Sequence, residues 1–132
     1  MQKNESQKNE SAKSPKEIVV SFLKYLNNRD LESARSCVSD NFVCISPPGL
    51  GSFDSAESYF KAAEQAQNVH ESSYKFEIKK ILTDGNDVCV FNDVIAGPIT
   101  LFACGWYHVE YGKIRSLRLV YDPRPLLNNR KE

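Results

Sequence analysis

Thiols and imidazoles are the side chains of this chain that could act as a nucleophile, a base or a metal ligand. There are four cysteines, at positions 37, 44, 89 and 104, and two histidines. Cys104 and His108 are four residues apart, which on a strand separates them by about 13 Å, too far for a Cys–His dyad. No two cysteines form a CxxC pair, and no spacing matches a zinc site. We therefore expect reduced, largely buried thiols, with no metal and no cofactor.

A second set of charges ends the last apolar run, GKIRSLRLVYDPRP at residues 112–125. Asp122 and Arg124 alternate there with two prolines, which cannot donate the hydrogen bonds that would continue a strand. We therefore expect Asp122 and Arg124 to form a structural clamp that hydrogen-bonds nearby backbone or helix ends. An active site at this position is not expected.

Three helices are expected in the first half of the chain. Ser14, Pro15 and Glu17 form a capping box with proline at the first helical position, and apolar residues follow at helical spacing. NNRD at 27–30 ends this helix, and residues 31–38 are expected to form a short second one. A brief strand follows at 42–45. Asp54 and Glu57 then predict another capping box before a third helix.

Strand patterns fill the second half of the chain. Residues 74–79 alternate apolar and charged side chains, which indicates a strand with one wet face. Residues 88–95, 99–110 and 113–121 are expected to be three more strands, the last two joined by a tight hairpin at Tyr111-Gly112. Three helices followed by an antiparallel meander predict an α+β fold, with the helices on the concave face of a bent sheet.

Length and charge narrow the class of protein. The 132 residues suit one domain, and 17 basic residues balance 17 acidic ones, so no global basic field favours nucleic acid or an anionic membrane. No apolar run approaches the roughly 20 residues of a membrane-spanning helix, and no signal segment is readable. We expect one domain over residues 14–127, a disordered polar tail over 1–13 that carries the repeat QKNES-QKNES, a frayed end over 128–132, and a cytoplasmic location.

The order of these elements, with FLKYLNNRDLESA, FNDV and GWYHVEYGKIRSLRLVYDPRP, resembles the nuclear transport factor 2-like superfamily. Within it the chain is most similar to the SnoaL-like polyketide cyclases and ketosteroid isomerase relatives, over about residues 15–126. The resemblance implies a cone-shaped α+β fold. Its helices and the concave sheet face would enclose an apolar pocket, and a few inward polar groups would set the chemistry.

The acids and bases of that branch are replaced here. The resemblance places Phe22 where the isomerases have a tyrosine, Ser46 at their base and Gly105 at their third acid. It places Leu119 where the cyclase-type relatives have an aspartate. Phenylalanine, glycine and leucine carry no ionisable group, and a serine hydroxyl without an adjacent base is a poor proton acceptor. The isomerase and cyclase mechanisms are therefore not expected.

Asp93 is the remaining candidate for acid–base chemistry. If Cys89 and Phe91 face the pocket, Asp93 faces it too, because side chains two apart share a face of a strand. An apolar pocket would raise the pKa of Asp93 and suit it to act as a general acid or base. The alternative is that Asp93 pairs with an arginine or a turn amide near a sheet edge. Asn92 would take the opposite face and be structural.

Two tyrosines could supply a proton donor. Tyr107 shares the parity of Gly105 and Val109 and is expected to point inward, where Tyr25 on the first helix could meet it. The alternative is that both are core aromatic residues with satisfied hydroxyls.

The outer face of the sheet predicts an interface. Phe102, Trp106, His108 and Arg118 share that face, and an exposed aromatic strip with an arginine fits a homodimer interface better than a monomer surface.

The sequence thus predicts a protein that binds a small apolar molecule, with neither nucleic acid nor membrane as partner. Any weak isomerase- or cyclase-like chemistry would centre on Asp93. The alternative is a non-catalytic dimerisation or protein-binding module whose pocket is filled by its own side chains. An open cavity of roughly 300 Å³ or more would favour ligand binding. The expected ligand-binding residues are Phe22, Tyr25, Ser46, Phe60, Phe91, Tyr107 and Leu119.

Overall fold

The computed structural model describes residues 13–47, 51–69 and 74–125. The predicted tail, up to residue 12, and the predicted frayed end over 128–132 lie outside the described residues. Within these ranges, none of the helices is long and apolar enough to cross a membrane.

The first helix begins where its capping signal predicts. Helix α2 (Pro15–Asn27) has Ser14 as its N-cap, and the Ser14 hydroxyl accepts from the Glu17 backbone N–H at 3.1 Å. The Glu17 carboxylate accepts in return from the Ser14 N–H at 2.8 Å, which completes the capping box. The buried face of α2 consists of Ile18, Val19, Phe22 and Leu23. The short helix α3 (Leu31–Arg35) follows, and it ends before residue 38.

The third helix begins one residue later than its sequence pattern suggests. Helix α4 spans Ala56–Val69, and the hydroxyl of Ser55 accepts from the Ser58 N–H at 3.1 Å. The capping side chain is therefore Ser55, so the expected Asp54–Glu57 capping box is wrong. A hydrogen bond of 3.0 Å between the hydroxyls of Ser55 and Ser58 also stabilises the cap that Ser55 forms.

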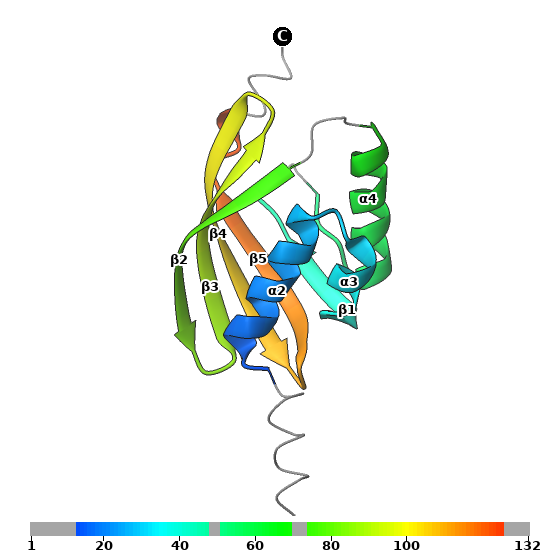
Figure 1. The fold of residues 1–132 in the computed structure, drawn as a ribbon, viewed down its shortest axis with the longest axis vertical. Coiled ribbons are helices and arrows are strands. Elements are labelled where there is room, and N and C mark those ends of the chain that lie inside the picture. The colour runs from blue at the N-terminus through cyan, green and yellow to red at the C-terminus, as the bar shows by residue number, and fades with distance from the viewer. Residues whose placement is uncertain (1–12, 48–50, 70–73, 126–132) are drawn as a thin grey trace, which may run out of the picture.

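Five strands form one sheet in the order β1-β5-β4-β3-β2. The last four pair antiparallel in sequence, as the meander predicts, whereas β1 adds in parallel to β5, so the sheet is mixed. Figure 1 shows the sheet curving beside the helices, with α2 across it and α3 and α4 near β1. This arrangement confirms the α+β class. The strands are β1 (Val38–Ile45), β2 (Tyr74–Asp84), β3 (Asp87–Ala96), β4 (Ile99–Glu110) and β5 (Lys113–Tyr121).

The tight hairpin between β4 and β5 fixes which side chains face the helices. Tyr111 and Gly112 have φ of +53° and +75°, the left-handed conformation that a two-residue hairpin turn requires. Tyr107 then pairs with Leu117 across the two strands, and both are 3% exposed. We call this helix-facing side of the sheet the inner face and the opposite side the outer face.

Candidate functional site

The middle of the inner face is filled by the chain's own side chains. Phe22 from α2 is fully buried and meets Tyr107 from β4 edge to face, with ring centroids 6.2 Å apart. Burial raises the pKa of the Tyr107 hydroxyl far above its usual range, so this group stays protonated at neutral pH. Tyr107 points inward as its parity predicts, but it occupies the space that a ligand would need.

Gly105 shows why no acid stands at this position of β4. A Cβ built on Gly105 would lie 2.9 Å from Cε1 of Tyr107 and 3.2 Å from Cδ1 of Leu117. Carbon atoms in van der Waals contact are about 3.5–4.0 Å apart, so the tyrosine ring excludes even a methyl group here.

The inner face of β3 carries Asn92 and not Asp93. Val88, Val90 and Asn92 are buried, at 0%, 0% and 6% exposure, and the residues between them face outward. The expectation that Asp93 faces a pocket is therefore wrong, and so is the placement of Asn92 on the outer face. The pairing of β3 with β4 is the reason, because inward Tyr107 is the partner of Val88, which shares its face with Asn92.

Asp93 lies in a charged cluster on the outer face. Its carboxylate is 3.6 Å from the Lys79 ammonium, which also contacts the Glu77 carboxylate at 3.2 Å. The alternative expected an arginine or a turn amide near a sheet edge as the partner of Asp93, whereas the partner is a lysine of the neighbouring strand. Phe91 shares this face and stacks on Phe102, with centroids 6.3 Å apart, so it is not positioned to line an inner pocket.

Asn92 is the one buried polar or charged residue among those that the structure describes. Its register partner on β4 is Ala103, and the partner of Ala103 on β5 is Tyr121. These three residues therefore form one row across the inner face, and the small Ala103 separates the amide from the tyrosine. Within strands β3, β4 and β5, no Asp, Glu or His side chain shares this face with Asn92.

A hollow of about 220 Å³ lies at the end of this row. It contains two of the expected ligand-binding residues, Ser46 just after β1 and Leu119 on β5, and it reaches Tyr121. Leu119 is half-buried and packs against the core. The structure therefore brings Ser46 and Leu119 together at a hollow that Phe22 and Tyr107 do not line. The hollow is lined by Ile45, Ser46, Pro47, Arg118, Leu119, Val120 and Tyr121.

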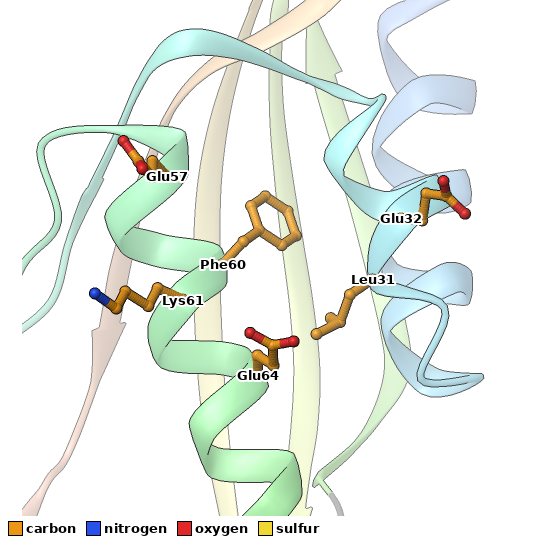
Figure 2. Close-up of a pocket in the computed structure, with 6 residues that line it drawn as sticks. All are labelled: Leu31, Glu32, Glu57, Phe60, Lys61 and Glu64. Atoms are coloured by element: carbon orange, nitrogen blue, oxygen red, sulfur yellow. The ribbon is translucent and has the colours of Figure 1, made fainter.

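The aromatic residues of α4 form a half-buried cluster beside the core. Tyr59 makes edge-to-face contacts with Phe42, Phe53 and Phe60, at centroid distances of 5.3, 5.7 and 5.0 Å. Tyr25 of α2 is also half-buried against the core. Phe60 points toward α3, into a groove between α3 and α4 that has a volume of about 530 Å³ (Figure 2).

The outer face carries the exposed apolar residues that the sequence predicts. Phe102, Trp106 and Val120 are 62%, 49% and 61% exposed, and Arg118 is the register partner of Trp106. We call Phe102, Trp106 and Val120 the outer apolar patch. Asp87 borders this patch and accepts from the Trp106 indole N–H at 2.9 Å.

His108 borders the same patch and is held between two carboxylates. Its Nδ1 is 2.9 Å from Asp87 and its Nε2 is 3.2 Å from Glu110. The hydrogen bond to Asp87 is the main reason that the pKa of His108 is raised.

The clamp at the end of β5 is local. The Arg124 guanidinium donates to the Asp122 carboxylate at 2.7–3.0 Å, and the Arg124 backbone N–H donates to it at 3.1 Å. These hydrogen bonds lower the pKa of Asp122. Asp122 therefore fixes the turn that follows β5, by accepting from the backbone N–H of Arg124, the first residue of a helical segment.

Three of the four thiols, those of Cys37, Cys44 and Cys104, are poor nucleophiles. All four cysteines are unpaired, and burial raises the pKa of Cys44 to about 11 and also raises the pKa values of Cys37 and Cys104. Among the described residues, no three His, Cys, Asp or Glu side chains gather closely enough to hold a metal ion.

Comparison with known proteins supports the fold over almost the whole chain. The sequence model of the family described as SnoaL-like domain matches residues 19–117. An NTF2-like protein of unknown function from Cytophaga hutchinsonii ATCC 33406 is 30% identical, with a TM-score of 0.77 over 89% of this chain and 98% of that one. No curated protein matches the chain.

Two more distant structures show the fold alone. An LEH-like epoxide hydrolase of M. tuberculosis is 22% identical, with a TM-score of 0.72 over 85% of each chain. TerC, co-crystallised with polyporic acid, is 16% identical, with a TM-score of 0.74 over 89% of this chain and 98% of that one.

Proposed function

The chain belongs to the SnoaL-like domain family, and from this premise we propose that it is a non-catalytic member that binds a small, uncharged, largely apolar molecule on its inner face. The observation that carries this proposal is the chemistry of that face. Its buried polar groups are the Asn92 amide and the Tyr107 hydroxyl, and strands β3, β4 and β5 place no carboxylate or imidazole on it. An amide cannot act as an acid or base at neutral pH, but it both donates and accepts hydrogen bonds.

The proposed site is the row Asn92–Ala103–Tyr121 together with the hollow that Tyr121 lines at its end. That hollow lies at the sheet edge, and Arg118 and Val120 of the outer face also line it. Neighbouring strands are about 4.8 Å apart, so the Asn92 and Tyr121 backbones are separated by roughly 10 Å across Ala103. At about 220 Å³ the hollow is smaller than the roughly 300 Å³ that would by itself favour ligand binding. The proposal is therefore limited to a compact ligand with one carbonyl or hydroxyl group, and it rests on the chemistry of the face and not on the volume.

The test compares a ligand that can hydrogen-bond with one that cannot. We expect 1-indanone to bind about two- to tenfold more tightly than indane, the worth of one neutral hydrogen bond. The variant Asn92→Leu should lose this preference while still binding indane, which also shows that it is folded. Asp93→Asn, a matched change one residue away on the outer face, should keep the preference. An Asn92→Leu protein that still prefers 1-indanone would contradict the proposal.

A second candidate function is homodimerisation through the outer apolar patch. Three large side chains exposed on one sheet face are more typical of an interface than of a monomer surface. We expect light scattering at micromolar concentration to give the mass of a dimer, and Trp106→Glu to give that of a monomer. Lys24→Glu on the exposed side of α2 is the control. A monomeric wild-type protein would refute this candidate.

A further inference from the structure

Two of the four cysteines are neighbours on the outer face of the sheet. Cys89 on β3 pairs with Trp106 on β4, and Cys104 on β4 pairs with Phe91 on β3, so the two cysteines are diagonal neighbours across the two strands. Both side chains project from the outer face, because the residues before and after each cysteine are buried on the inner one.

The twist of the sheet brings this diagonal together. The Val109 N–H donates to the Asn86 carbonyl at 2.9 Å, and from there hydrogen-bonded and non-hydrogen-bonded pairs alternate along β3 and β4. Cys89 and Cys104 both fall at non-hydrogen-bonded positions, where opposing side chains are closest. The right-handed twist then shortens one of the two diagonals. The shorter one joins a residue to the position two before its direct partner, as Cys104 stands two before Trp106.

The two thiols influence each other and can be reached from solvent. Burial raises the pKa of the Cys104 thiol, and the neighbouring Cys89 thiol raises it further. Cys104 therefore keeps its proton at neutral pH, which leaves Cys89 as the thiol that reacts first. Both side chains are half-buried and unpaired, so the pair is reduced and part of each residue is exposed.

We propose that Cys89 and Cys104 form a reversible disulfide across β3 and β4 by exchange with a small-molecule disulfide. The Cys89 thiolate attacks one sulfur of that molecule, forms a mixed disulfide and releases one thiolate. The Cys104 thiol then loses its proton to solvent, attacks the Cys89 sulfur and releases the second thiolate. The two protein thiols are thus oxidised to one disulfide, and the small-molecule disulfide is reduced to two thiols.

The cross-link would stabilise a pairing that already exists. It joins adjacent strands of one hairpin, so the sheet keeps its register, and the closed loop restricts the unfolded chain. We expect the oxidised chain to unfold at a temperature roughly 3–10 °C higher than the reduced chain. Because partly exposed disulfides are readily reduced, the cross-link should also be removed by a thiol.

The test oxidises the full chain with glutathione disulfide and follows its intact mass. The mixture is left until the mass stops changing, so slow exposure of the thiols does not alter the result. We expect the mass to fall by two hydrogens, and an excess of reduced glutathione to restore it. The endoproteinase that cuts before aspartate separates the cysteines at Asp87 and Asp93. The peptides that carry Cys89 and Cys104 should stay linked until a reductant is added.

Serine variants assign the role of each thiol. Cys104→Ser should stop at the mixed disulfide and carry one glutathione, because the second thiol is missing. Cys89→Ser should form no disulfide and should take up glutathione much more slowly than Cys104→Ser does. Cys37→Ser is the matched control, since Cys37 precedes β1 and lies outside the pair. It should form the disulfide as the wild type does.

Two results would overturn the proposal. One is a wild-type chain that takes up glutathione but never loses two hydrogens. The other is a disulfide that involves Cys37 or Cys44, or that joins two chains. The thiols lie on the outer face and the 1-indanone experiment reports on the inner one, so this proposal and the proposed function can fail separately.

Discussion

Gly105→Ala is the substitution that most directly tests whether the middle of the cone is filled. The added methyl would lie 2.9 Å from Cε1 of Tyr107 and 3.2 Å from Cδ1 of Leu117, well inside the 3.5–4.0 Å of normal carbon contacts. Gly105 is not among the glycines with positive φ, so its backbone suits any residue and the cost is steric alone. Overpacking of this kind costs about 1–3 kcal/mol.

One effect opposes this cost. Replacing glycine with alanine restricts the unfolded chain and by itself stabilises a protein by about 0.4–1 kcal/mol. We therefore expect Gly105→Ala to lower the free energy of unfolding by about 1–2 kcal/mol. Urea unfolding followed by the fluorescence of Trp106, the single tryptophan, measures this value.

A double-mutant cycle identifies the atoms responsible. Tyr107→Leu removes the ring atoms that the new methyl would meet, although it also lowers stability by itself. In the Tyr107→Leu background, Gly105→Ala should cost less than in the wild type, with a coupling energy of about 1–2 kcal/mol. An equal cost in both backgrounds would refute the reasoning, because it would show that the tyrosine ring does not occupy this space.

Two further predictions concern α2 and the outer face. The Asn27 amide accepts from the Phe76 N–H at 2.7 Å and donates to the Phe76 carbonyl at 2.9 Å, so Asn27→Ala should lower the free energy of unfolding by about 2 kcal/mol in urea unfolding, whereas Asn28→Ala should cost little. If Asn27→Ala lowers the free energy of unfolding no more than Asn28→Ala does, the two hydrogen bonds between Asn27 and Phe76 do not contribute to stability. An NMR titration should give His108 a pKa above the ordinary value of about 6.5, and Asp87→Asn should lower it. Because the folded-state pKa of His108 is raised, the stability gained from its hydrogen bond to Asp87 is complete below the unfolded-state pKa and is lost as pH rises through the folded-state pKa. An unchanged His108 pKa in the Asp87→Asn variant would contradict this.

The local elements follow from short-range chemistry. The capping box at Ser14 and the left-handed pair Tyr111-Gly112 each depend on a few neighbouring residues, and both occur where the sequence places them. The strands at 99–110 and 113–121 have the predicted bounds, because turn residues punctuate the chain on both sides. The absence of an ionisable acid or base at Phe22, Ser46, Gly105 and Leu119 is likewise a property of the sequence.

The tertiary structure decided which side chains face the helices and where the hollows form. Both parities of FNDV are plausible from composition, since Cys89 and Phe91 are as apolar as Val88 and Val90, and only the pairing of β3 with β4 turns Asn92 inward and Asp93 outward. The parallel addition of β1 to β5 joins residues more than 70 apart in the chain, and it brings Ser46 beside Leu119. The groove between α3 and α4 arises in the same way, because no local pattern sets the distance between two helices that contact through their side chains. The sequence by itself therefore determined which chemical groups the chain carries, and long-range packing determined which of them meet.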